Sequence, residues 1–266
     1  MIKAPKILIF DSGAGGLSIA IEVIKTCPGA HFVYAADHAY FPYGIKQDAE
    51  LTARIVSQVE SLYKKIQPDL VVVACNTAST LALETLRTEF PCPFVGVVPA
   101  IKPAAKLTQT GVIGVLATPA TVNRAYTHNL IEDFAPKQKI VMHGSDTLVT
   151  LAEDKINKGE INEGQLNQEL RTLFDKEHGE EIDTVVLACT HFPLLKPELI
   201  SWARGENKNV NWIDSGKAIA DRVQTLLGGK PNMRSSKKKN LTLEFQLISS
   251  ANAALFEHHI KTHCRT

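Results

Sequence analysis

The chain has 266 residues, of which 44% are hydrophobic and 21% are charged, and its formal net charge at pH 7 is +1. This length predicts two domains, and this composition is typical of a folded globular protein rather than a disordered one. The near-neutral charge argues against binding of nucleic acid or an anionic membrane through a general electrostatic field. No apolar stretch approaches the roughly 20 residues that span a bilayer, and the residues before Ile7 lack the features of a secretory signal. We therefore expect a cytoplasmic protein.

Short runs rich in Val, Ile and Leu alternate with amphipathic helical patterns, the clearest of which are Asp48–Ile66, Leu166–Phe174 and Ser215–Leu227. Nearly continuous apolarity is typical of strands that are buried on both faces of a parallel sheet. The expected strands are Ile7–Phe10, Phe32–Ala36, Leu70–Ala74, Phe94–Val98, Val112–Leu116, Lys139–His143, Thr184–Ala188, Val210–Ile213 and Leu241–Ile248. The alternation predicts an α/β fold with mostly parallel sheets covered by helices. The basic segment Arg234–Lys239 is interpreted as a solvated loop.

Part of the sequence is repeated within the chain. Asp69–Thr77 (DLVVVACNT) recurs as Asp183–His191 (DTVVLACTH), and a weaker pair is formed by Ile7–Gly13 and Val112–Thr118. In each weaker copy an apolar strand leads into a small polar turn. The pairs predict two pseudo-symmetric α/β domains. We place the first domain in residues 1–98 plus 207–266 and the second in residues 99–206, and we expect the active site in the cleft between them.

The chain contains five cysteines, at positions Cys27, Cys75, Cys92, Cys189 and Cys264. Their odd number and wide spacing argue against a disulfide framework. Cys75 and Cys189 occupy equivalent positions just after a predicted strand, where parallel sheets collect reactive groups. A free cysteine is usually a small buried hydrophobe, but two equivalent copies favour a functional pair.

Polar residues follow each of these two cysteines at the start of a predicted helix, namely Asn76, Thr77, Thr190 and His191. Backbone N–H groups at helix starts, together with such side chains, can hold a carboxylate, which would suit a small dicarboxylic substrate. His191 lies two residues beyond Cys189, so that both side chains can project to the same side as a thiol–imidazole pair. A zinc site is the alternative explanation, but the chain lacks C-x-x-C spacing and clustered Cys and His ligands.

The segment Asp11–Gly16 (DSGAGG) follows the first predicted strand. It resembles a phosphate-cradling loop but has neither the Lys-Ser/Thr of a P-loop nor the glycine spacing of a dinucleotide fingerprint, which argues against nucleotide binding. A plain turn before a helix is the alternative. A carboxylate directly at a strand end nevertheless favours a capping or functional role for Asp11.

Two thiols on opposite sides of a bound amino acid can invert its stereocentre. One thiolate removes the α-proton while the other thiol delivers a proton to the opposite face, and the roles exchange in the reverse direction. A free thiol with a pKa near 8.5 is only about 3% thiolate at pH 7, so that the site must favour ionisation of one cysteine. We expect Asp11 and His191 to act as proton acceptors or orienting groups. This chemistry requires neither a pyridoxal lysine nor a metal.

Several motifs, in this order, resemble those of the glutamate racemases in the aspartate/glutamate racemase superfamily. They are Asp11–Leu17 (DSGAGGL), Pro42–Gly44 (PYG), Ala74–Ser79 (ACNTAS), Pro99–Ala104 (PAIKPA) and Cys189–Leu195 (CTHFPLL). The resemblance spans residues 7 to 227, with a weaker match beyond. It implies cofactor-independent interconversion of L- and D-glutamate, supply of D-glutamate for peptidoglycan, a pseudo-symmetric two-domain α/β fold, and homodimers among its members.

Carried over by position, the resemblance implies that Cys75 and Cys189 are the two acid/base residues, with Cys75 acting on D-glutamate and Cys189 on L-glutamate. The substrate contacts it implies are Asp11, Ser12, Tyr43, Gly44, Asn76, Thr77, Thr118, Thr121, Thr190 and His191. One segment departs from the family pattern, because Gly144–Leu148 (GSDTL) replaces a more usual Cys-Pro stretch ahead of a functional glutamate. Glu153 falls at the matching place and is a further candidate contact, and the sequence leaves its role, like that of Asp37, open.

Three alternatives keep this fold but change the function. A racemase for aspartate or another amino acid would keep both cysteines, although Pro42–Gly44 and the Asp11–Gly16 segment favour glutamate. A thiol hydrolase or decarboxylase needs only one reactive cysteine, so the pair argues against it. A non-catalytic amino-acid-binding protein would bind its ligand without exchange of the α-proton and would tolerate loss of both thiols.

Overall fold

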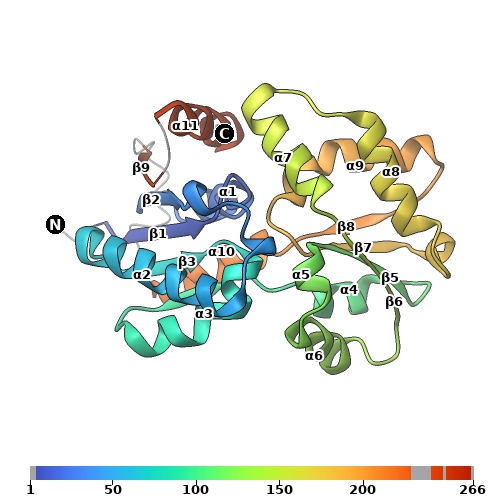
Figure 1. Ribbon diagram of the computed structural model, residues 1–266, viewed down its shortest axis with the longest axis horizontal. Helices are drawn as coiled ribbons and strands as arrows, with labels where there is room; N and C mark the ends of the chain where they lie inside the picture. The colour runs from blue at the N-terminus through green and yellow to red at the C-terminus, as the bar shows by residue number, and fades with distance from the viewer. Residues whose placement is uncertain (1–3, 229–240, 248–249, 265–266) are drawn as a thin grey trace. The chain divides into compact units, whose positions relative to one another are not determined.

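The computed structural model describes residues 4–228, 241–247 and 250–264, so that the predicted solvated loop at Arg234–Lys239 lies outside the described residues. The chain forms two compact units, which are Met1–Val97 with Gly216–Thr266, and Val98–Ser215. Each unit contains one sheet with helices packed on it (Figure 1). We call them the first and second units.

The first unit contains a five-stranded sheet of order β4-β3-β1-β2-β9, in which every pairing is parallel. Its strands are β1 (Lys6–Asp11), β2 (His31–Ala36), β3 (Leu70–Val73), β4 (Phe94–Gly96) and β9 (Thr242–Gln246). Its helices are α1 (Leu17–Thr26), α2 (Asp48–Ile66), α3 (Asn76–Glu89), α10 (Gly216–Leu226) and α11 (Ser250–Cys264), and two 3-10 turns, η1 (His38–Tyr40) and η2 (Tyr43–Ile45), follow β2.

Alternating residues of these strands pack against different helices. Leu8 and Phe10 of β1 belong to the buried cluster that includes α2 and α3. The α2 side chains in this cluster recur every three or four residues, as the helical period requires, and are Leu51, Ile55, Val59, Leu62 and Ile66. Burial of each such side chain contributes about 1.5–3 kcal/mol. On β2, Tyr34 contacts Phe256 of α11, with ring centroids 5.8 Å apart, so that both faces of the sheet are covered.

The second unit contains a four-stranded parallel sheet of order β6-β5-β7-β8. Its strands are β5 (Val112–Ala117), β6 (Lys139–Gly144), β7 (Thr184–Leu187) and β8 (Asn211–Ile213). Its helices are α4 (Ile101–Leu107), α5 (Pro119–Val122), α6 (Ala125–Phe134), α7 (Thr147–Lys158), α8 (Glu163–Phe174) and α9 (Lys196–Gly205), with 3-10 turns η3 (Gly179–Glu181) and η4 (Phe192–Leu195).

The core of the second unit is built in the same way. Ile113 and Val115 of β5 pack with Ile101 of α4 in one buried cluster. On the opposite face, a Cβ added at Gly114 would lie 3.3 Å from Leu173 of α8. The absence of a side chain at Gly114 therefore allows α8 to approach the sheet closely.

The predicted α/β fold with parallel sheets is confirmed, and the repeated sequence corresponds to repeated topology. The order β4-β3-β1-β2 of the first unit is matched by β8-β7-β5-β6 of the second. Each of the nine expected strands forms in the described part of the chain, with ends shifted by at most a few residues. The segment Asp69–Thr77 thus crosses the end of β3, and Asp183–His191 crosses the equivalent end of β7.

The return of the chain to the first unit differs from the expected boundary. The sequence placed residues 207–266 with the first domain, but β8 pairs with β7, where Asn211 lies opposite Thr184. Residues 207–215 therefore belong to the second unit, and the return begins at Gly216. Hydrogen bonding of β8 to the free edge of β7 is the physical reason for the shift.

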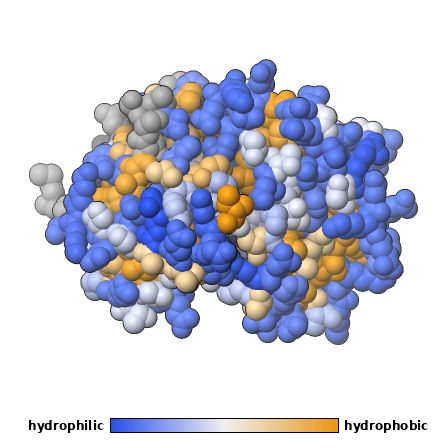
Figure 2. Space-filling model, in the orientation of Figure 1, coloured by the Kyte–Doolittle hydropathy of each residue, from blue (hydrophilic) through white to orange (hydrophobic). Residues whose placement is uncertain are grey.

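Hydrophilic residues predominate on the face drawn in Figure 2, and apolar residues lie between them in separate patches. Such scattered apolar residues are normal on the surface of a folded protein. In the part of the chain that the structure describes, no helix combines the length and apolarity needed to cross a membrane.

Candidate active site

Cys75 lies at the carboxyl end of β3 and immediately precedes α3, whose first residues are Asn76 and Thr77. Because β1 and β3 are parallel neighbours, Asp11 and Ser12 at the end of β1 reach the same edge of the sheet. The Ser12 Oγ and Cys75 Sγ atoms are 3.9 Å apart, and both residues are buried. The first unit therefore brings a thiol, a hydroxyl and the N–H groups of a helix start to one place.

The Asp11 carboxylate shapes the turn after β1. Its Oδ1 accepts a hydrogen bond from the Gly13 N–H at 2.6 Å, as in an Asx turn, and the Tyr34 hydroxyl donates to the Gly13 carbonyl at 2.8 Å. A Cβ added at Gly16 would lie 2.7 Å from the Asp11 Cβ and 2.8 Å from the Tyr34 Oη. Close packing thus explains this glycine without a bound phosphate.

Tyr43 begins η2 and is buried in the same cluster as Cys75. Its hydroxyl donates to Asp37 Oδ2 at 2.9 Å. Burial, together with the charge and hydrogen bond of Asp37, raises the pKa of Tyr43 far above its usual value, so that it remains a neutral phenol. Gly44 follows in the same turn and is half-buried.

Cys189 occupies the equivalent position in the second unit, beyond β7, and is followed by Thr190 and His191 ahead of η4. The predicted thiol–imidazole pair is present, with Cys189 Sγ 3.7 Å from His191 Nδ1. On its other side, His191 Nε2 lies 2.8 Å from Glu153 Oε1 of α7. The two units therefore surround their equivalent thiols with different groups.

The electrostatics of this trio depend on burial, because only 4% of His191 and 7% of Glu153 are exposed. Burial is the largest influence and disfavours the imidazolium. The hydrogen bonds and charges of Cys189 and Glu153 together outweigh it and raise the pKa of His191 well above its ordinary value. Because the Nε2–H of the protonated ring donates to Glu153, its Nδ1–H faces the Cys189 sulfur.

Thr118 and Thr121 lie beyond β5, the strand next to β7. The Thr118 Oγ caps α5 by accepting a hydrogen bond from the Thr121 N–H at 3.3 Å, and the two hydroxyl oxygens are 2.9 Å apart. The Thr127 hydroxyl donates to the Thr121 carbonyl at 2.6 Å. Thr121 is fully buried and thus orients the hydroxyl of Thr118.

Lys155 lies about half a turn beyond Glu153 on α7 and was not predicted from the sequence. Its Nζ donates to the Leu194 carbonyl at 2.8 Å and to Glu198 at 2.7 Å. These contacts fix the η4 turn that follows His191. No sequence motif marks Lys155, because its partners lie far along the chain.

The predicted site residues thus fall into two clusters. In the first unit, the residues near Cys75 are Asp11, Ser12, Tyr43, Gly44, Asn76 and Thr77. In the second unit, the residues near Cys189 are Thr118, Thr121, Glu153, Thr190 and His191. Across the described residues, no group of three or more His, Cys, Asp and Glu side chains could hold a metal ion.

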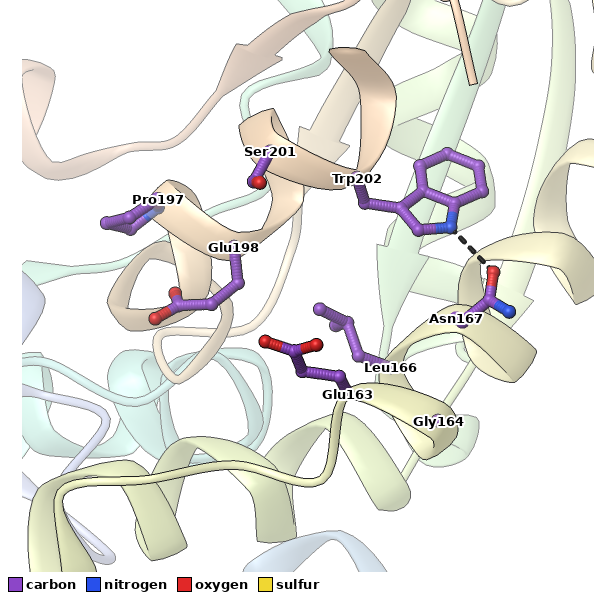
Figure 3. A pocket seen from close by; sticks show the side chains of 8 residues that line it. All are labelled: Glu163, Gly164, Leu166, Asn167, Pro197, Glu198, Ser201 and Trp202. Atoms are coloured by element: carbon purple, nitrogen blue, oxygen red, sulfur yellow. Dashed lines mark hydrogen bonds between the residues drawn. The ribbon is translucent and has the colours of Figure 1, made fainter. Parts of the chain in front are cut away.

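A surface pocket of about 570 Å³ lies elsewhere in the second unit, between α8 and α9 (Figure 3). The Glu163 and Glu198 side chains project into it from the two helices, and Trp202 Nε1 donates to Asn167 Oδ1 at 2.8 Å. Two carboxylates repel a dicarboxylate ligand. This pocket is therefore unsuited to glutamate, and none of the predicted site residues lines it.

Comparison with known proteins agrees with this geometry. The model of the Asp/Glu/hydantoin racemase family matches residues 18–223. The glutamate racemase of Sodalis glossinidius is 47% identical over 225 residues, which are 85% of this chain and 76% of that protein. The glutamate racemase of Pectobacterium atrosepticum is 47% identical over 237 residues, which are 89% of this chain and 81% of that protein.

Among solved structures, the Escherichia coli glutamate racemase in complex with L-glutamate and the activator UDP-MurNAc-ala superposes with a TM-score of 0.87. It is 41% identical, over 98% of this chain and 96% of that one. The two parallel sheets match each other, and each carries a cysteine at the same strand end. Together with sequence matches of this extent, this identifies the chain as a member of the Asp/Glu/hydantoin racemase family, in its glutamate racemase branch.

Proposed function

We propose that this protein interconverts L- and D-glutamate by moving the α-proton between Cys75 and Cys189. The observation that carries the proposal is the equivalence of the two thiols, which follow matching strands β3 and β7 of two sheets with the same strand order. The relatives named glutamate racemase support glutamate as the substrate.

In the L-to-D direction, the Cys189 thiolate first takes the α-proton of L-glutamate, and the Cys75 thiol then gives its proton to the opposite face of the carbanion that results. After the product has formed, Cys189 is a thiol and Cys75 is a thiolate. This is the protonation state that the D-to-L direction requires. Another L-to-D turnover needs Cys189 to lose a proton and Cys75 to gain one. Exchange with water completes the cycle, so that solvent hydrogen enters the product.

His191 is suited to the proton exchange at Cys189. In the resting pair, the Nδ1–H of the His191 imidazolium faces the Cys189 thiolate at 3.7 Å, and Glu153 stabilises this imidazolium. After the thiolate has taken the α-proton, the ring gives its Nδ1 proton to water and then accepts the thiol proton, which restores the thiolate and the imidazolium. We infer that Glu153 acts as a positioning residue through His191 rather than as a direct substrate contact.

The substrate carboxylates need hydrogen-bond donors. The start of α3 directs its first backbone N–H groups toward this end of β3, and Asn76 and Thr77 add side-chain donors there. Thr190 and the Thr118 hydroxyl play the same part in the second unit. Donors directed at the α-carboxylate also stabilise the negative charge that develops on the adjacent carbon.

The family resemblance supports two further parts of the proposal. D-Glutamate made in this way would supply peptidoglycan synthesis, and the protein would work as a homodimer. Light scattering of the purified protein, with and without glutamate, tests the second part, and a monomer under both conditions would overturn it.

The test of the reaction is incubation with L-glutamate, and separately with L-aspartate, in deuterium oxide without added cofactor. Optical inversion and α-deuterium incorporation are followed for the wild type, Cys75→Ala and Cys189→Ala, with Cys92→Ala as a matched control because Cys92 precedes β4 and is not one of the predicted site residues. We expect inversion of glutamate with solvent deuterium, which either site variant abolishes and the control retains.

Three results would lead elsewhere. Faster inversion of aspartate would make the protein an aspartate racemase. Binding of glutamate with no α-exchange would make it a binding protein. Turnover that survives the loss of one thiol would exclude the two-cysteine mechanism.

A further inference from the structure

Asp37 follows β2 and is a buried carboxylate, with 2% of its surface exposed. Arg54 of α2 holds it with two hydrogen bonds, from Nε to Oδ2 at 2.6 Å and from Nη2 to Oδ1 at 2.7 Å. Tyr43 donates to the same Oδ2 at 2.9 Å. A bidentate guanidinium matches the geometry of a carboxylate and fixes its plane.

This group joins three parts of the first unit. The Asp37 backbone N–H donates to the Asp11 carbonyl at 2.9 Å, its carboxylate holds Tyr43 of η2, and Arg54 anchors it to α2. Arg54 in turn lies over the Tyr40 ring, 4.5 Å from its centroid. The residue that ends β1 and the tyrosine of η2 are therefore tied to one rigid helix.

The hydrogen bond to Asp37 determines what Tyr43 can offer. A phenol has one proton, and here that proton is given to Asp37, so that the oxygen has only acceptor capacity left. Tyr43 and Cys75 pack in the same buried cluster, and the charged forms of Cys75 and Asp11 both contribute to the raised pKa of Tyr43.

We propose that Arg54 and Asp37 are positioning residues for proton transfer at Cys75, because they hold Tyr43 and its turn beside the thiol with the phenol oxygen available only as a hydrogen-bond acceptor. The proposal deepens, and rests on, the proposed two-cysteine racemisation. An acceptor of fixed orientation is complementary to a thiol S–H or to the ammonium group of the substrate.

The second unit has no equivalent of this pair. Ser145 occupies the matching position after β6, and its N–H donates to the Ala117 carbonyl at 2.9 Å, as that of Asp37 does to Asp11. The Ser145 hydroxyl, however, accepts a hydrogen bond from the Leu148 N–H in the first turn of α7. The effect of Arg54 and Asp37 is therefore expected at Cys75 and not at Cys189.

The variants that test this are Arg54→Gln, Arg54→Lys, Asp37→Asn and Tyr43→Phe, with Glu60→Gln as a control on the exposed side of α2. A 1 Å misplacement of a reacting group can cost about 100-fold. Because Arg54 acts through Asp37 and Tyr43, we expect Arg54→Gln to lower kcat/KM by less than this, about 10-fold. Arg54→Lys keeps the positive charge but cannot form the two parallel hydrogen bonds of the guanidinium group. Its kcat/KM should therefore lie between those of Arg54→Gln and the wild type. Thermal unfolding of each variant shows which of them are folded.

The decisive measurement is the primary deuterium isotope effect on kcat/KM with α-deuterated D-glutamate and with α-deuterated L-glutamate. The enantiomers have equal free energies, so that kcat/KM must fall by the same factor in both directions. If the step at Cys75 is slowed, that step becomes more rate-limiting. The isotope effect then rises for D-glutamate, whose deuterium Cys75 removes, and falls for L-glutamate.

A ratio of the two isotope effects that stays at the wild-type value in folded Arg54→Lys and Asp37→Asn would overturn the positioning role, and so would a shift toward L-glutamate. Failure of the proposed function is recognised separately, because the wild type would then show no α-exchange. The Glu60→Gln ratio must match that of the wild type.

Discussion

Replacing Glu153 with glutamine removes a negative charge from the group that holds His191. Glu153 Oε1 lies 2.8 Å from His191 Nε2, and both residues are buried. Glutamine has nearly the same size and keeps an acceptor oxygen. The variant therefore tests the charge of the contact rather than its shape.

The magnitude follows from the loss of a charge-assisted hydrogen bond. Such a bond contributes about 1.5–3 kcal/mol, against about 0.5–1.5 kcal/mol for a neutral one, so we expect the free energy of unfolding to fall by about 1–2 kcal/mol. The pKa of His191 is raised in the folded protein. The stabilisation by the charged pair is therefore fully present below the unfolded pKa of about 6.5 and is lost as the pH rises through the folded value.

Urea unfolding of wild type and Glu153→Gln at pH 6 and pH 9 measures this difference, which should be larger at pH 6. Titration of 13C-labelled histidine by NMR follows His191 directly and should show a lower pKa in the variant. We also expect kcat to fall by roughly 10-fold or more, in line with the loss of acid–base assistance. A wild-type His191 pKa at or below its ordinary value, or an equal stability difference at both pH values, would refute the reasoning.

Three further perturbations test the local structure. Gly16→Ala should lower the free energy of unfolding by about 1–3 kcal/mol, measured in urea, because its Cβ would lie 2.7 Å from the Asp11 Cβ; unchanged stability would contradict the packing argument. Lys155→Met should lower kcat several-fold, because it removes the hydrogen bond to the Leu194 carbonyl. Activity equal to that of the surface control Arg171→Gln would show that the η4 turn does not depend on this hydrogen bond. Asp183→Asn should lower the free energy of unfolding by about 1 kcal/mol at pH 7. Burial opposes ionisation of Asp183, but hydrogen bonds from Thr108 and the adjacent backbone outweigh it and lower the pKa of this carboxyl group. The difference in stability, measured by urea unfolding, should therefore disappear as the pH falls through that lowered pKa.

The sequence by itself determined which segments form strands and helices, because apolar periodicity is a local property of the chain. Asp48–Ile66 was predicted as a helix and forms α2 with the same ends. The repeat Asp69–Thr77 and Asp183–His191 also predicted that two thiols follow equivalent strands. Even the Cys189–His191 pair could be predicted, since two residues of one loop are joined by the backbone itself.

Only the tertiary structure decided which groups surround those thiols. Glu153 meets His191 across 38 positions and Arg54 meets Asp37 across 17, and packing of helices on the sheet, rather than any local pattern, brings such partners together. The sequence of a three-residue strand such as β8 does not indicate which sheet the strand joins. The pairing of β8 with β7 set the boundary between the units. The repeat in the sequence did not predict that different side chains surround the two thiols, because equivalent backbone positions carry Asp37 in one unit and Ser145 in the other.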